Sequence, residues 1–411
     1  MARLLLILPT ATYRAPDFLD ASAQVGAEVV VASERPQVLA ETMQDRFLEI
    51  DLRRPDTAAD AIVALSRRRR IDGIVAVDDQ GVLAAALAAG RLDLPHNPRD
   101  AVMATRDKVA MRDDLAAAAV RQPRYASVAV DEDVGEVAGA VGFPCVIKPP
   151  SLSASRGVIR VDDAAGAKLA GDRVRGILAE AGEDPSRLLV EAYVPGPEVA
   201  LEGLLRGGAF ETLAVFDKPD PLEGPYFEET IFVTPSRLPE AAVAAVERTA
   251  AEACAAIGLV EGPVHAELRT DGTDAWLIEV AARSIGGLCS RALSFGVGVS
   301  LERLIVSHAL GTPIEGLARE RQAAGVMMLP IPAEGRLAAV GGQDQARQVP
   351  GVTGLDVSIA PGRRVRPLPE GDRYLGFLFA KAETPEEVEA TLRQAHGMLE
   401  VRVVEDEEGD G

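Results

Sequence analysis

Hydrophobic residues near the N-terminus form short continuous runs that are separated by helical patterns. Residues 4–8 are all apolar and end at a proline, which is typical of a buried parallel strand. Residues 28–33 and 73–77 have the same character. Between these two runs lies a helical pattern with Asp56 as its expected cap, and residues 82–89 form another helical stretch. Strands that alternate with helices predict an α/β unit with a parallel sheet.

The pattern changes between residues 143 and 280, where short apolar segments follow one another in hairpin-like order. The expected strands are residues 145–148, 188–194, 199–205, 231–234, 264–268 and 276–280. One long helix interrupts them, because apolar residues repeat at helical spacing from Pro239 until Gly258 ends the pattern. The middle of the chain is therefore predicted to be α+β rather than regularly wound.

A third region begins after about residue 311. Strands are expected at residues 325–329 and 374–380, and a helix opened by Thr384 is expected to run to about residue 396. A proline-containing turn at residues 95–98 separates the first region from the second. The expected domains are residues 1–97, residues 98–312 with a central lid at about residues 120–200, and an α+β domain at residues 313–411.

Composition and charge narrow the range of functions. The chain has 411 residues, of which 47% are apolar and 26% charged, and its net charge is −20. This charge repels polyphosphate, and the 4% aromatic content provides little surface for base stacking, so nucleic-acid binding is not expected. Three separated cysteines and the lack of a long apolar run indicate a cytoplasmic protein without a disulfide framework, a signal segment or a membrane span.

A first candidate for chemistry is the lysine that ends the expected strand at residues 145–148. Lys148 is followed by a loop of small residues, which contains Ser151, Ser153, Ser155 and Gly157. Backbone N–H groups and hydroxyls of such a loop can approach phosphate oxygens closely. The sequence contains neither a Walker A motif nor G-x-G-x-x-G, so nucleotide binding would have to use this other device. A strand that ends in an ordinary surface loop is the alternative interpretation.

A second candidate lies about forty residues later. Glu191, Tyr193 and Val194 run into a Pro-Gly-Pro turn that ends at Glu198. An acidic side chain or an open backbone edge at this place can hold adenine and ribose. A polar hairpin turn without a ligand remains the alternative.

Two further expected strands each carry a central glutamate, Glu267 and Glu279. If the strands pair, both carboxylates come within reach of one Mg²⁺, which prefers oxygen ligands. Arg283 follows, and then Gly286 and Gly287. An arginine beside a metal-bound triphosphate can stabilise charge on a transferred phosphoryl group. The alternative is two edge glutamates and a surface arginine.

Taken in order, these motifs resemble those of the ATP-grasp superfamily of carboxylate–amine ligases, over residues 97–310. The resemblance adds Lys108 to the set, and implies the ATP-grasp fold with a Rossmann-like domain before it. It implies that Lys108 and Lys148 neutralise the α- and β-phosphates of ATP and that residues 151–157 close as a lid. The remaining implied roles are adenine contacts for Glu191, Tyr193 and Val194, ribose contacts for Glu198, Mg²⁺ (or Mn²⁺) ligation by Glu267 and Glu279, and the reacting centre for Arg283.

Residues 216–230 and the third region are similar to the bacterial L-amino acid ligases, which join two amino acids into a dipeptide. The resemblance implies an acyl phosphate, formed from a carboxylate and ATP, that the amine of a second substrate attacks. Glu229 and Glu202 are candidates for the base that deprotonates this amine, and Gly286 and Gly287 for the substrate site. Many relatives have an asparagine metal ligand where this chain has Ala281, which leaves the number of metal ions open.

Two rival functions remain. One is another ATP-grasp reaction, such as carboxylation or the ligation of a non-amino-acid carboxylate. The other is a nucleotide-binding sensor without turnover, although such a sensor needs no arginine at the reacting centre. The expected partners are small-molecule substrates, and a homodimer is the commonest assembly for such enzymes.

Overall fold

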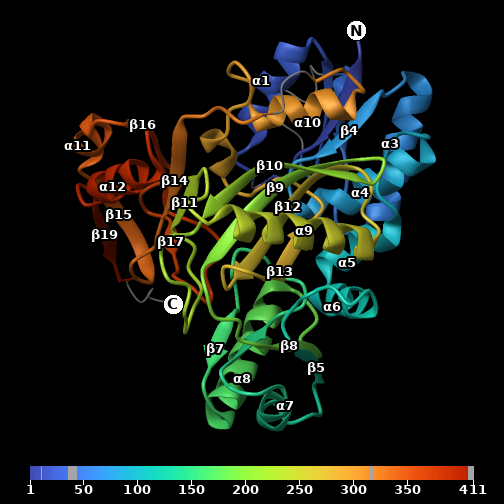
Figure 1. The fold of residues 1–411 in the computed structure, drawn as a ribbon. Helices are drawn as coiled ribbons and strands as arrows, with labels where there is room; N and C mark the ends of the chain where they lie inside the picture. The colour runs from blue at the N-terminus through green and yellow to red at the C-terminus, as the bar shows by residue number, and fades with distance from the viewer. Residues whose placement is uncertain (11, 36–43, 315–317, 406–411) are drawn as a thin grey trace, which may run out of the picture.

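Four β-sheets organise the described part of the chain, which comprises residues 1–10, 12–35, 44–314 and 318–405 of a computed structural model (Figure 1). The described residues combine a parallel α/β unit with α+β regions, in the order that the sequence predicts. Figure 1 shows the lobe formed by β5, β7, β8, α7 and α8 at one end of the molecule, away from the N-terminal elements.

The N-terminal sheet is parallel, with the strand order β3-β2-β1-β4. Its elements are β1 (Arg3–Ile7), α1 (Ala15–Val25), β2 (Glu28–Ser33), the 3-10 turn η1 (Gln44–Arg46), β3 (Phe47–Glu49), α3 (Pro55–Arg68), β4 (Gly73–Ala76) and α4 (Asp79–Arg91). The predicted parallel α/β unit is therefore confirmed. The prediction of Asp56 as a cap is wrong, because α3 begins at Pro55 and Asp56 already lies in its first turn.

The lobe at residues 125–192 contains an antiparallel sheet with the order β5-β8-β6-β7. Its elements, and the two helices that lead into it, are α5 (Arg99–Arg106), α6 (Lys108–Ala117), β5 (Tyr125–Ala129), α7 (Val134–Val141), β6 (Cys145–Lys148), β7 (Ile159–Val161), α8 (Ala164–Ala181) and β8 (Arg187–Ala192). Apolar side chains of α7 and α8 pack on this sheet, and together they form a separate hydrophobic core. Lys148 ends β6, as the sequence predicts.

The largest sheet has eight strands in the order β13-β12-β9-β10-β11-β14-β18-β16. Its strands and the helices near them are β9 (Glu198–Arg206), β10 (Ala209–Asp217), β11 (Ile231–Thr234), α9 (Glu240–Ile257), β12 (Gly262–Thr270), β13 (Ala275–Ala281), the 3-10 turn η2 (Cys289–Ala292), α10 (Leu301–Ala309), β14 (Ala323–Leu329), β16 (Val352–Val357) and β18 (Gly376–Ala382). The helix α9 ends at Gly258, whose φ of 85° suits glycine and confirms the predicted stop.

Strands from the third region extend this same sheet. β14 pairs with β11 and β18, so hydrogen bonding continues across the expected boundary at residue 312. The remaining elements are β15 (Gly335–Gly341), α11 (Gln343–Gln348), β17 (Arg364–Val365), α12 (Pro385–His396) and β19 (Glu400–Val404), of which the three strands form a small antiparallel sheet. Thr384 caps α12 together with Glu387 in a capping box, as expected from the sequence. The domain boundaries themselves stay predictions.

Among the helices that the structure describes, none combines the length and the apolar character that a membrane crossing requires.

Candidate active site

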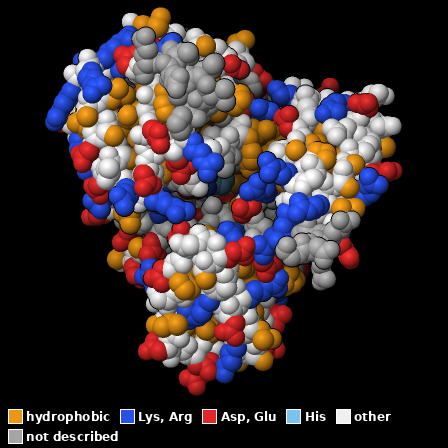
Figure 2. Space-filling model, turned by 180° about the vertical axis from the view of Figure 1, so that it is seen from behind, with side chains coloured by type: hydrophobic (Ala, Val, Ile, Leu, Met, Phe, Trp, Pro, Cys, Tyr) orange, Lys and Arg blue, Asp and Glu red, His pale blue; other side chains and the backbone are white. Residues whose placement is uncertain are grey.

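A cavity of about 360 Å³ lies between the lobe at residues 125–192 and the eight-stranded sheet. Figure 2 shows basic and acidic side chains gathered around the hollow above this lobe. Most of the predicted site residues line the cavity: Lys108, Lys148, Ser153, Ser155, Glu191, Tyr193, Val194, Glu198, Glu229, Glu267, Glu279, Arg283, Gly286 and Gly287. Ser151, Gly157 and Glu202 do not line it. The volume falls within the range of small-molecule sites, about 300–1,000 Å³.

Lys148 is held inside a buried cluster of two cations and one carboxylate. Its Nζ lies 2.7 Å from Oε2 of Glu191, and Nε of Arg112 lies 2.6 Å from Oε1 of the same carboxylate. Burial alone would raise the pKa of Glu191, but the charges of Arg112 and Lys148 outweigh it and hold this pKa below its usual value. Burial also lowers the pKa of Lys148, against the attraction of Glu191. The cluster carries one excess positive charge.

The structure places the carboxylate of Glu191 between two cations, each of which engages one of its oxygens. Glu191 also lines the cavity, and its adenine contact stays a prediction. Tyr193 and Val194 also line the cavity. The backbone N–H of Tyr193 donates to the carbonyl of Pro144 at 3.0 Å, and the carbonyl of Val194 accepts a hydrogen bond from Arg269 at 2.9 Å.

Lys108 connects the small-residue loop with one of the two paired glutamates. Its Nζ donates a hydrogen bond to the carbonyl oxygen of Leu152 at 2.7 Å and lies 3.2 Å from Oε1 of Glu279. Its backbone N–H also donates to the carbonyl of Pro150. Lys108 and Lys148 therefore approach the cavity from different elements, as two phosphate-binding lysines would.

The loop at residues 151–157 is attached to the C-terminal region. The backbone N–H of Gly157 donates to the carbonyl of Pro369 at 2.9 Å, and Nε of Arg156 donates to the carbonyl of Glu370. The carboxylate of Glu370 in turn accepts two hydrogen bonds from Arg173 of α8, at 2.6 and 3.0 Å. The closure of this loop as a lid stays a prediction.

Alternation along β9 and β12 directs a row of charged side chains toward the cavity. Glu198 lies opposite Arg269, and Glu202 lies opposite His265. The intervening apolar residues, including Leu201 and Leu268, point to the other face and pack beneath α9. Because side chains alternate between faces, one face of these strands is a charged floor and the other is core.

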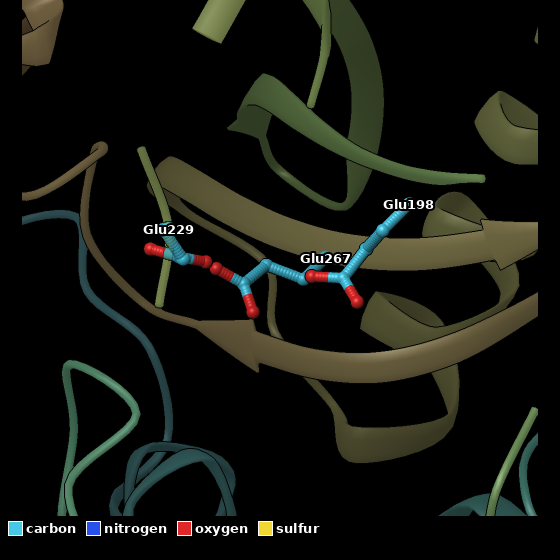
Figure 3. Close-up of side chains that lie close together, drawn as sticks. All are labelled: Glu198, Glu229 and Glu267. Atoms are coloured by element: carbon cyan, nitrogen blue, oxygen red, sulfur yellow. The ribbon is translucent and has the colours of Figure 1, made fainter. Parts of the chain in front are cut away.

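The expected pairing of Glu267 with Glu279 is confirmed, since they lie opposite each other where β12 pairs with β13. Glu267 also belongs to a cluster with Glu198 and Glu229, in which one ligand atom from each residue lies within 4.8 Å of the others. Figure 3 shows these three carboxylates in a row, with Glu267 between the other two. Carboxylate oxygens are the ligands that Mg²⁺ prefers, so Glu267 and the opposed Glu279 fit the implied metal.

Lys218, at the end of β10, is the buried cation of this acidic cluster. Its Nζ lies 2.8 Å from Oε1 of Glu198 and 3.2 Å from Oε1 of Glu267, and it also contacts Glu229. Burial would raise the pKa of Glu267, but the charges of Lys218 and His265 hold it well below its usual value. Burial, followed by the charge of Glu267, raises the pKa of Glu229 to about 8.

Glu202 lies behind the cavity wall. Its side chain is buried, Oε1 lies 2.6 Å from Nδ1 of His265, and Oε2 accepts a hydrogen bond from the backbone N–H of Ile285. It therefore holds His265 and the segment after β13, and does not reach the cavity as a substrate contact. Burial would lower the pKa of His265, but the charge of Glu202 raises it to about 9.

Arg283 is oriented by the N-terminal region. Its Nε lies 2.8 Å from Oδ2 of Asp79, at the start of α4. The next residue, Ser284, accepts a hydrogen bond from the buried Arg14 at 2.7 Å. Two residues from the parallel α/β unit therefore fix the segment that carries the predicted reacting-centre arginine.

Gly286 and Gly287 follow Arg283 and line the cavity. Gly287 has a φ of 60°, and a Cβ atom there would lie 2.7 Å from the ring of Phe377, so a larger residue does not fit. Cys289 also lines the cavity, and burial raises the pKa of its thiol. This direction argues against a thiolate nucleophile at Cys289.

Sequence reasoning missed several charged residues of the site, namely Arg112, Lys218, Arg269 and Asp79. Two signals were present. Arg269 follows Glu267 by two residues and therefore shares its strand face, and Lys218 directly follows a strand. Arg112 and Asp79 lie on helices that reach the cavity only through the tertiary fold.

Three family models match the chain, one in each of its three successive regions. They are the ATP-grasp N-terminal domain at residues 19–96, the ATP-grasp domain at residues 141–292 and the L-amino acid ligase C-terminal domain 2 at residues 327–404. The chain belongs to the ATP-grasp superfamily of carboxylate–amine ligases. The cavity of this ATP-grasp protein is therefore its candidate active site.

Two curated proteins illustrate the sequence relationship. The uncharacterized protein y4rH of Sinorhizobium fredii is 24% identical, over 96% of this chain and 82% of its own length. The alanine–anticapsin ligase of Bacillus subtilis is 26% identical, over 56% of this chain and 52% of its own length. The present chain therefore spans about half the length of that ligase.

A solved structure shows the same fold over nearly the whole chain. It is the L-amino acid ligase of Bacillus licheniformis, with a TM-score of 0.80 and 24% identity. The likeness covers 98% of this chain and 99% of that one. All regions of the present chain, including the third, are thus part of one known architecture.

Proposed function

We propose that this chain is an ATP-dependent ligase that joins the carboxylate of one amino acid to the amine of a second and forms a dipeptide. The observation that carries the proposal is the single cavity lined by Lys148, Arg283 and the opposed carboxylates of Glu267 and Glu279. The match of residues 327–404 to an L-amino acid ligase domain supports amino acids as the substrate class.

The charged residues of the cavity would bind different parts of Mg-ATP. Lys108 and Lys148 would neutralise the phosphates of ATP, with Glu191, itself held by Arg112, keeping the ammonium of Lys148 in place. Glu267 and Glu279 would hold Mg²⁺, which supplies further positive charge at the phosphates when it is bound. Arg283 would stabilise the charge that develops as a carboxylate oxygen attacks the γ-phosphorus and ADP leaves.

The second step needs a dry cavity and a proton acceptor. The acyl phosphate is attacked by the free amine, phosphate leaves, and the amine nitrogen loses a proton. Glu229 is the better of the two predicted bases, because it lines the cavity. Burial raises its pKa to about 8, so its deprotonated form, populated as the pH approaches 8, is a stronger base than an ordinary carboxylate. Closure of residues 151–157 would exclude water, which otherwise hydrolyses the acyl phosphate.

The test is phosphate release from Mg-ATP with all single amino acids and all pairs, followed by mass spectrometry of the products. We expect release with at least one pair and a product of dipeptide mass. Arg283→Lys keeps the charge but loses the planar guanidinium, and should lower the rate without abolishing nucleotide binding. ATP binding without release for any pair would contradict the proposal and direct the search to other carboxylates or to a sensor.

A further inference from the structure

The cluster of Glu198, Glu229 and Glu267 has the geometry of a divalent cation site, yet a side chain of the protein already lies in it. One ligand atom from each carboxylate lies within 4.8 Å of the others, which is close enough for ligands of a single ion. The ammonium of Lys218 contacts the same three carboxylates. One lysine therefore meets the donor set that a metal would need.

Lys218 is fixed in this place by its surroundings. Its side chain is 3% exposed, and its Nζ lies 5.1 Å from the ring centroid of Phe232. Its backbone N–H donates to the carbonyl of Glu198, and the preceding Asp217 is bound by Arg237 and Ser236. The ammonium therefore has no short path into solvent.

A metal ion and this ammonium exclude each other. Both need the same oxygens, and two cations at about 3–4 Å repel each other strongly where water is absent. On the other side of Glu267, the paired Glu279 stays outside the cluster and lies near Lys108. Ala281, opposite His265 in the register, provides no side-chain ligand.

We propose that Lys218 is a built-in cation that takes the place of a metal ion in the cluster of Glu198, Glu229 and Glu267. A divalent cation is then restricted to the side of Glu267 that faces Glu279. Lys218 thereby acts as a positioning residue, because it fixes Glu267 while the other side of this carboxylate stays available. The replacement of a metal by Lys218 does not depend on ligase activity, whereas the role of Glu279 rests on the proposed function.

The test counts bound Mn²⁺ in nucleotide-free protein by the loss of the free-ion signal in electron paramagnetic resonance. Lys218→Met keeps the length and the apolar stem of the side chain but removes its charge. We expect this variant to gain one Mn²⁺ site, at least tenfold tighter than any site of the wild type. Adding Glu229→Gln should remove the gained site, adding Glu279→Gln should leave it, and Lys218→Arg alone should gain none.

A folded Lys218→Met protein with the Mn²⁺ stoichiometry of the wild type would overturn the proposal. The wild type decides the question independently if Lys218→Met does not fold. Its Mn²⁺ binding should be insensitive to Glu229→Gln, and a loss of bound Mn²⁺ on that substitution would show that the cluster holds a metal despite Lys218. Failure of phosphate release, with Mn²⁺ counts as expected, would affect only the proposed ligase function.

Discussion

Two buried charge clusters face the same cavity with opposite excess charge. At Lys148 two cations share the carboxylate of Glu191, at 2.6 and 2.7 Å. At Lys218 one ammonium is shared by three carboxylates, with Glu198 at 2.8 Å and Glu267 at 3.2 Å. The first cluster is therefore suited to anionic phosphates, whereas the second already holds a cation of the protein.

The two clusters show how a protein keeps unpaired charge stable at a dry site. In each cluster one central group of the opposite charge is bound by all the others. The carboxylate of Glu191 is bound by two cations, and the ammonium of Lys218 is bound by three carboxylates. Burial disfavours any charge, so the remaining excess must be held by geometry until a ligand balances it. Mutations that remove the central group of a buried cluster should therefore lower the free energy of unfolding more than mutations of exposed ion pairs.

The largest effect is expected for Glu191→Gln. It leaves Lys148 and Arg112 buried without their counter-charge, which should lower the free energy of unfolding by about 3–5 kcal/mol. Urea unfolding measures this change. Asp56→Asn is the matched control, because Asp56 also pairs with an arginine at 2.7 Å but its side chain is 52% exposed, so a loss below about 1 kcal/mol is expected. Equal losses in both variants would contradict the comparison.

Lys148→Met tests the function of the cationic cluster. Loss of a fixed positive charge at the phosphates should lower kcat/KM for ATP by about 10²–10³-fold, a size typical for a group that stabilises developing charge. Steady-state phosphate release gives the value. Lys168→Met removes an exposed lysine that pairs with Asp133 at 2.8 Å, and should leave kcat/KM unchanged. A small effect at Lys148 would mean that Lys108 alone suffices.

The stability of the protein should depend on pH through His265, which lies beside the acidic cluster. The pKa of His265 is raised from 6.5 to about 9, so the protonated form is stabilised by folding. This contribution, about 3 kcal/mol, should be complete below pH 6.5 and lost as the pH rises through about 9. Urea unfolding of the wild type and of His265→Gln should therefore differ more at pH 6 than at pH 9.5.

A difference between wild type and His265→Gln that stays constant from pH 6 to 9.5 would argue against the pairing of His265 with Glu202.

The smallest effect on stability is expected for the segment that contains Glu370 and Tyr374. Glu370 binds Arg173, and Tyr374, four residues later, lies with its hydroxyl 3.5 Å from Glu229. Because the ion pair is partly exposed, Glu370→Gln should cost less than about 1 kcal/mol in unfolding free energy. The KM for ATP should rise a few-fold, since the segment to which the loop at residues 151–157 is hydrogen-bonded loses its ion pair with α8.

A control of similar exposure is Asp274→Asn, which breaks the pair with Arg121 far from the loop. It should leave the KM for ATP unchanged. If both variants change KM alike, the effect is one of general stability and the attachment of the loop has no separate role.

The sequence predicted which residues line the cavity better than it predicted which side chains bind one another there. The positions of Lys148 at the end of β6 and of Glu267 opposite Glu279 followed from strand patterns and motif order. Glu202 was expected at the substrate, because it shares a strand face with Glu198, yet it is covered by His265 and the segment at Ile285. Periodicity indicates the face on which a side chain lies, but not how far that face remains open.

The sequence by itself determined the α/β and α+β order, the strand alternation that directs charges to one face, and the succession of lysines, glutamates and arginine along the chain. These features are local, because they depend on periods of two to four residues and on turn chemistry. Only the tertiary structure decided that Arg112 joins Lys148, that Asp79 orients Arg283 and that Lys218 enters the carboxylate cluster. Each of these pairs joins different structural elements, and their stability comes from burial, which exists only once those elements have packed together.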